Sequence, residues 1–117
     1  MIWLASLAYA EPAVLVDCSE LGAALSLVVL GAARIPAAEK EKPVKIPEGQ
    51  WTLRFLTEDL GTLEVRPNTL LIAAFAGDTL ELAAWPVATR TKKLCKKLHQ
   101  GQLPAPTEVL VSVPLAR

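Results

Sequence analysis

The stretch WTLRFLTEDLGTLEVRPNTLLIAAFAGDTLELAAWP, residues 51–86, decides the fold. Its first residues alternate in polarity, because Trp51, Leu53 and Phe55 fall on one face of a strand and Thr52 and Arg54 on the other. Groups of turn-forming residues then separate the apolar runs, at 58–61, 66–69 and 76–79. The pattern predicts four antiparallel strands joined by short turns, a β-meander over about 51–85.

Apolar runs outside the meander predict further strands. One covers 13–16, between Pro12 and Asp17, and another covers 108–113, which ends at Pro114. We expect these N- and C-terminal strands to extend the same antiparallel sheet.

Residues 18–30 allow two interpretations. Asp17 followed by Glu20 resembles a capping box, and the Ala- and Leu-rich residues that follow favour a helix from about Cys18 to Leu30. The competing interpretation is a strand over 25–30, where Val28 and Val29 add β propensity.

Together these elements predict one α+β domain over 1–117, an antiparallel sheet with one or two helices packed on one face. The stretch 36–50 alternates prolines with charged residues and is expected to be an exposed loop.

The first residues, MIWLASLAYAEP, can be interpreted as a secretory signal or as a strand. Ala8-Tyr9-Ala10 has the form of a cleavage site, but no Lys or Arg precedes the short apolar run before it. We therefore expect a strand over about 2–9 and a cytoplasmic protein.

The two cysteines, Cys18 and Cys95, form no CxxC motif and no disulfide framework. In a cytoplasmic protein we expect them to be buried free thiols, whereas an exported protein would allow one long-range disulfide.

Composition favours association with other chains. The chain is 52% hydrophobic over only 117 residues, so its limited interior should leave some apolar surface exposed. We expect a homo-oligomer or a subunit of a larger assembly. The formal net charge of +0 argues against the global basic excess of most nucleic-acid-binding proteins.

Cations gather in one place, on a helix expected over 89–100. Leu94, Cys95 and Leu98 form its narrow apolar stripe, and Gly101 is expected to end it. The candidate contacts to a partner or to phosphates are Arg90, Lys92, Lys93, Lys96 and Lys97. The alternatives are the solvated outer face of a packed helix, a nucleic-acid contact or a membrane contact, and we do not expect the membrane.

Other candidate sites have simpler explanations. Cys95 and His99 share a helix face, but they lie near the C-terminal end, where the helix dipole opposes a thiolate. The carboxylates Glu58, Asp59 and Asp78 fall in turns, where such residues are ordinarily solvated. Because the nucleotide-binding and hydrolase motifs are also missing from the sequence, we expect no catalytic, metal-ligating or cofactor-binding residue and infer no small-molecule ligand.

These observations predict a non-enzymatic protein-interaction or assembly protein, a small oligomeric adaptor or complex subunit. The alternative is a nucleic-acid-associated protein that uses the basic helix over 89–100. A third possibility is a small enzyme with no recognisable motif.

Overall fold

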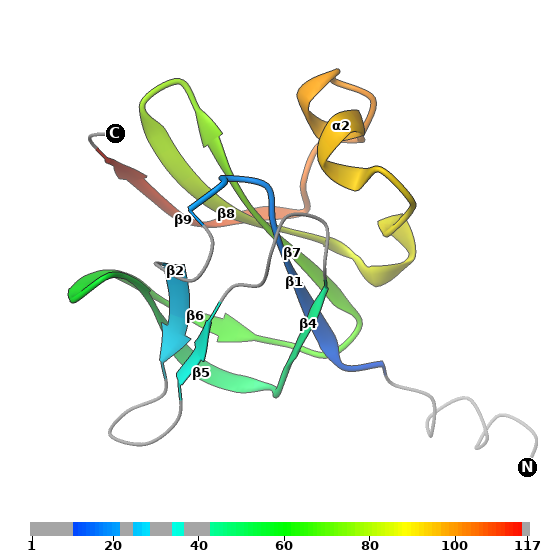
Figure 1. Cartoon of the computed structure of the whole chain (residues 1–117). Helices are drawn as coiled ribbons and strands as arrows, with labels where there is room; N and C mark the ends of the chain where they lie inside the picture. Colours follow the sequence, from blue (N-terminus) through cyan, green and yellow to red (C-terminus); the bar gives the residue numbers. More distant parts are fainter. Residues whose placement is uncertain (1–10, 22–24, 29–33, 37–42, 116–117) are drawn as a thin grey trace, which may run out of the picture.

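The computed structural model describes residues 11–21, 25–28, 34–36 and 43–115, which form two β-sheets and a short α-helix (Figure 1). The strands are β1 (Ala13–Asp17), β2 (Leu25–Val28), β3 (Arg34–Pro36), β4 (Val44–Ile46), β5 (Gly49–Phe55), β6 (Glu58–Val65), β7 (Thr69–Ala76), β8 (Thr79–Pro86) and β9 (Glu108–Pro114). A 3₁₀ helix, η2 (Val87–Thr89), and the α-helix, α2 (Leu94–His99), lie between β8 and β9. The strand expected over 2–9 lies outside the described residues.

The strands divide into two sheets. Sheet A has the order β4-β1-β7-β8-β9, and sheet B has the order β3-β2-β5-β6. Sheet B is antiparallel, but β1 runs parallel to β7 in sheet A. The prediction of a purely antiparallel sheet is therefore wrong for sheet A, although the strand predicted over 13–16 is present as β1.

The four strands predicted over 51–85 are present, but they do not form one meander. β5 pairs with β6 in sheet B, β7 pairs with β8 in sheet A, and the chain crosses between the sheets after Val65. The first turn also falls earlier than predicted, at Leu56 and Thr57. β7 is buried on both faces and lies between β1 and β8, so neither of its edges is open to β6.

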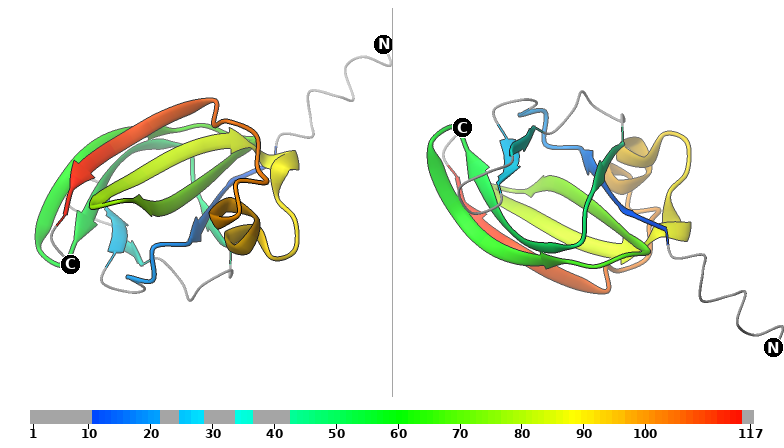
Figure 2. Two further views of the ribbon diagram at one scale, coloured as in Figure 1. Left: turned by 90° about the horizontal axis from the view of Figure 1, so that it is seen from above. Right: turned by 90° about the horizontal axis from the view of Figure 1, so that it is seen from below.

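Two apolar clusters explain why both faces of β7 are buried. Leu71 and Ala73 face sheet B and join the cluster between the sheets, whereas Leu70 and Ile72 face the opposite way, into a cluster that α2 covers. Sheet B, sheet A and α2 thus form three successive layers (Figure 2). The expectation of helix packed on one face of a sheet agrees with the position of α2.

The helix predicted from Cys18 to Leu30 is wrong where the structure describes it, because Leu25–Val28 form β2. β2 pairs with β5 along its whole length, and this pairing outweighs the helix propensity of the Ala- and Leu-rich sequence. Asp17 does not cap a helix: its carboxylate accepts hydrogen bonds from the backbone N–H of Ser19, at 2.9 Å, and from the Ser19 hydroxyl. The competing interpretation of a strand agrees with β2, and residues 22–24 and 29–33 lie outside the described part.

The stretch 36–50, expected to be an exposed loop, contains β4 and the start of β5. Ile46 is fully buried in the core between the sheets, because the chain turns there from sheet A into sheet B. Trp51 donates a 2.9 Å hydrogen bond from Nε1 to the carbonyl of Pro47 and holds this corner. Residues 37–42 of the expected loop lie outside the described residues.

The helix predicted over 89–100 is present but shorter. It begins at Leu94, after Lys93 in a left-handed conformation with φ of 57°, and neither Thr89 nor Thr91 caps it. Gly101 follows the helix with φ of 70°, a conformation that glycine adopts without strain. The strand predicted over 108–113 is confirmed as β9.

Candidate partner-binding surface

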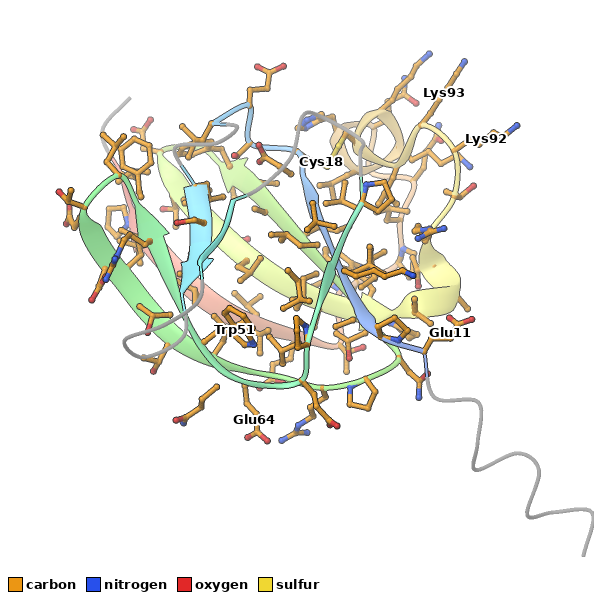
Figure 3. The ribbon with its side chains drawn as sticks, turned by 60° about the horizontal axis from the view of Figure 1, so that its bottom comes forward. Glu11, Cys18, Trp51, Glu64, Lys92 and Lys93 are labelled. Atoms are coloured by element: carbon orange, nitrogen blue, oxygen red, sulfur yellow. A yellow bond between two sulfur atoms is a disulfide. The ribbon has the colours of Figure 1, made fainter. Side chains whose placement is uncertain are left out.

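The five cations singled out in the sequence lie together on and just before α2. We call them the basic surface: Arg90, Lys92, Lys93, Lys96 and Lys97. Lys92 and Lys93 project into solvent ahead of the helix (Figure 3). Lys97 is half-buried and donates a 3.3 Å hydrogen bond to the Thr91 hydroxyl. Within the described ranges no carboxylate forms an ion pair with any of the five.

A disulfide fixes the basic surface to the sheet. Cys18, just after β1, and Cys95, on α2, are both buried and are joined at an S–S distance of 2.06 Å with their Cα atoms 5.3 Å apart. The neighbouring Leu94 is buried in the cluster between sheet A and the helix, and Leu98 packs against it. A six-residue helix is too short to be stable alone in water, so these contacts hold α2 in place.

The expectation of free thiols is therefore wrong. The two cysteines are 77 residues apart, and the pairing depends on α2 folding back over the end of β1. The sequence contained an even number of cysteines, but it did not indicate that these two elements meet. Because Cys95 is in the disulfide, it is no thiol partner for the exposed His99.

A hollow of about 530 Å³ opens beside the basic surface. Its apolar lining comes from Val16, Pro43 and Leu94, which belong to three separate segments of the chain. Three cations also line it, Arg90, Lys92 and Lys93. We call it the basic hollow. Its lining suits a ligand in which an apolar group lies next to a negatively charged group.

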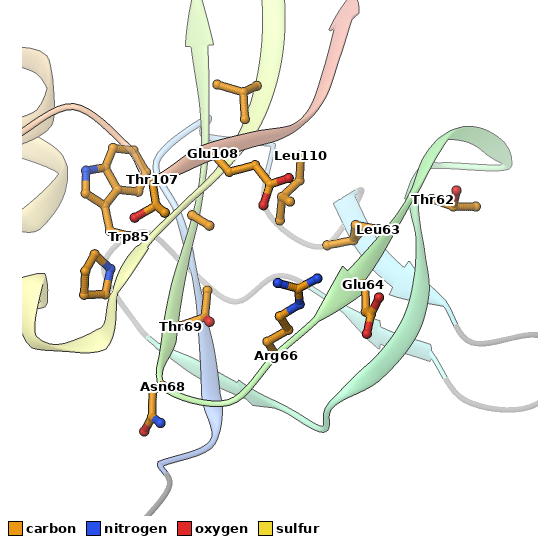
Figure 4. Close-up of a pocket in the computed structure, with 13 residues that line it drawn as sticks. Thr62, Leu63, Glu64, Arg66, Asn68, Thr69, Trp85, Thr107, Glu108 and Leu110 are labelled. Carbon is orange, nitrogen blue, oxygen red and sulfur yellow. The ribbon is translucent and has the colours of Figure 1, made fainter.

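A second hollow, of about 570 Å³, lies between the outer strands β6 and β9 (Figure 4). Arg66 and Glu108 point into it from opposite walls, and Leu63 and Leu110 also line it (Figure 4). Its lining contains no histidine or cysteine.

The three carboxylates that could form an acid–base set lie on exposed parts of two β-hairpins. Glu58 and Asp59 lie at the start of β6, and Asp78 lies in the turn between β7 and β8. Arg54 forms an ion pair with Asp59, at 2.7 Å from Nε to Oδ1. All three carboxylates are exposed. In the part of the chain that the structure describes, no three His, Cys, Asp or Glu side chains are grouped so as to hold a metal ion.

The β5–β6 turn exposes a leucine, Leu56, that no sequence pattern indicated. Leu56 is 61% exposed and has φ of 55°, a left-handed conformation that costs a leucine about 1 kcal/mol. The sequence predicted the turn at 58–61, two residues later, so Leu56 was expected within the strand and not in a turn.

The fold and surface thus define a small protein of two sheets that carries a cationic surface held by a disulfide. No protein-family model, no curated protein and no solved structure matches this chain. Among the described residues, the helix present falls short of the length and apolarity needed to cross a membrane.

Proposed function

We propose that this protein is a non-enzymatic interaction protein that binds an acidic protein surface through its basic surface. The observation that carries the proposal is the set of five cations without carboxylate partners, presented on a helix that a disulfide holds in place. Ordering this surface before a partner arrives lowers the entropic cost of binding.

Other features favour a protein over a nucleic acid as the partner. The four described aromatic residues, Trp51, Phe55, Phe75 and Trp85, are buried or half-buried, so none is fully exposed for base stacking. The net charge of +0 differs from the global basic excess of most nucleic-acid-binding proteins.

Binding of fluorescently labelled poly-L-glutamate, followed by fluorescence anisotropy at low salt, tests the proposal. We expect saturable binding that weakens as salt is added, because exposed charges are screened. The double variant Lys92→Glu/Lys93→Glu should bind about tenfold more weakly, since it replaces attraction with repulsion at two positions.

A matched control comes from an exposed cation elsewhere. Lys93→Glu and Arg66→Glu change the net charge equally, but Arg66 lies in the β6–β9 hollow. Only Lys93→Glu should weaken binding. Equal losses for both variants would contradict a localised site. A duplex DNA or phosphatidylglycerol vesicles bound more tightly than poly-L-glutamate would favour the nucleic-acid or membrane alternative instead.

The disulfide bears on the compartment, which the sequence led us to expect to be the cytoplasm. The expectation of free thiols followed from that location, whereas Cys18 and Cys95 are paired. Disulfides persist in oxidising environments and are rare in the cytosol. We therefore propose that the protein works in an oxidising compartment.

A further inference from the structure

The turn between β5 and β6 presents an apolar side chain beside negative charge. Leu56 is more exposed than the other exposed large hydrophobic residue of the described chain, Val109, at 61% against 46%. Glu58 and Asp59 follow it, and Glu58 has no ion-pair partner among the described residues. We call Leu56, Thr57, Glu58 and Asp59 the acidic tip.

The basic hollow has the complementary chemistry. Pro43 is the exposed apolar residue of its lining and can contact a leucine side chain, whereas Val16 and Leu94 are buried beneath it; Arg90, Lys92 and Lys93 match the carboxylate of Glu58. The hollow has a volume of about 530 Å³ and opens to solvent.

The acidic tip and the basic hollow lie at opposite ends of the molecule. In Figure 1 the β5–β6 turn points to the left and α2 lies at the right, and both views in Figure 2 show the same separation. The acidic tip of a folded chain therefore does not reach its own basic hollow, and the two surfaces can meet only between copies.

We propose that the acidic tip of one copy docks into the basic hollow of a second copy. Leu56 would contact Pro43, while Glu58 would approach Arg90, Lys92 and Lys93, and Asp59 would keep its ion pair with Arg54. The inference rests on the proposed function, because it names a second copy of this chain as the acidic partner.

The contact joins two different surfaces, so each copy in a pair still has one unused tip and one unused hollow. Such head-to-tail contacts close into a ring or continue as an open chain, depending on the rotation between neighbours. Association should therefore increase with concentration and should decrease with salt.

Sedimentation velocity of the oxidised full-length chain, over a range of concentrations at low salt, tests this inference. The wild type should form dimers and larger species. Leu56→Asn should weaken association about tenfold or more, because it removes the apolar contact. Asparagine tolerates a left-handed backbone, so this variant should fold normally. The control Val109→Thr alters the other exposed hydrophobic residue and should associate like the wild type.

A charge exchange tests the pairing itself. Glu58→Lys alone and Lys92→Glu/Lys93→Glu alone should each be mostly monomeric, because the first removes the unpaired negative charge of the tip and the second gives the hollow the same sign of charge as the tip. An equimolar mixture of the two proteins should recover association in pairs, since the unaltered hollow of the Glu58→Lys protein can bind the unaltered tip of the other protein.

The outcomes separate this inference from the proposed function. A wild type that stays monomeric but binds poly-L-glutamate overturns the docking of a second copy and leaves the proposed function standing. Association that survives both Leu56→Asn and Glu58→Lys, or a mixture that fails to recover it, also overturns the docking. Absence of both self-association and poly-L-glutamate binding overturns both proposals.

Discussion

Gly61 lies where β6 of sheet B meets β9 of sheet A. A Cβ atom at this position would lie 3.3 Å from Cγ1 of Val111, closer than most such contacts. Val111 is itself buried in the core between the sheets, so it has little room to move away. The missing side chain thus allows the outer strands of the two sheets to approach at this point.

We expect Gly61→Val to lower the free energy of unfolding by about 1–3 kcal/mol, because the added methyl groups overfill this contact. Urea unfolding measures the change. In the double variant Gly61→Val/Val111→Ala, the free energy of unfolding should fall by less than the sum of the two single losses, since the smaller side chain at 111 makes space for the valine. Thr62→Val, at an exposed neighbouring position, serves as the control and should change little. Additive losses in the double variant would contradict the close approach.

At the scale of elements, α2 depends on its attachments. It has six residues, begins without a side-chain cap and buries only Leu94 and Cys95. Trp85 adds a link between the same cluster and the segment after α2, by donating a 2.9 Å hydrogen bond from Nε1 to the carbonyl of Pro104. The disulfide and this apolar cluster, rather than helix propensity, explain why the basic surface is ordered.

Removing the disulfide with Cys18→Ala/Cys95→Ala should therefore destabilise the protein. Closing a loop of 77 residues restricts the unfolded chain, which corresponds to about 4 kcal/mol in the chain-entropy model. Urea unfolding gives the overall loss, and tryptic cleavage at the basic surface should become faster as α2 detaches. The wild type treated with a reductant should behave like the variant. Unchanged stability and cleavage would show that the cluster alone holds the helix.

At the scale of the whole molecule, the disulfide bears on the compartment in which the protein works. Alkylation of intact producing cells with a thiol-reactive maleimide, before lysis, should label neither Cys18 nor Cys95. Labelling should require prior reduction, because both sulfur atoms are already bonded to each other. Two labelled cysteines without reductant would place the protein in a reducing compartment and contradict the proposed location.

Local patterns predicted individual elements better than their arrangement. The alternation from Trp51 and the apolar runs before Asp17 and Pro114 identified strands that are present. In the predicted meander β6 pairs with β7, but in the structure β1 takes that place. The local patterns did not indicate this exchange, because strand pairing depends on packing between segments far apart in the sequence. For the same reason β2 was not distinguished from a helix: its partner β5 follows it by more than twenty residues.

The sequence predicted which cations form the candidate site, but not the structure that surrounds and holds them. The five cations could be read from the sequence, since α2 and the preceding turn expose them as a local pattern implies. The disulfide, the basic hollow and the exposed Leu56 each require segments far apart in the sequence or an unusual backbone conformation. No periodicity in the sequence encodes such features.

The link between Cys18 and Cys95 also has a mechanical consequence. Tension applied along the chain would pass through the sulfur bridge and bypass everything from β2 to η2. That bypassed length would extend to about 260 Å if it were released, at the span of an extended residue. In the oxidised protein, therefore, tension can extend only the segments before Cys18 and after Cys95. The segment between the two cysteines does not lengthen until the disulfide is reduced.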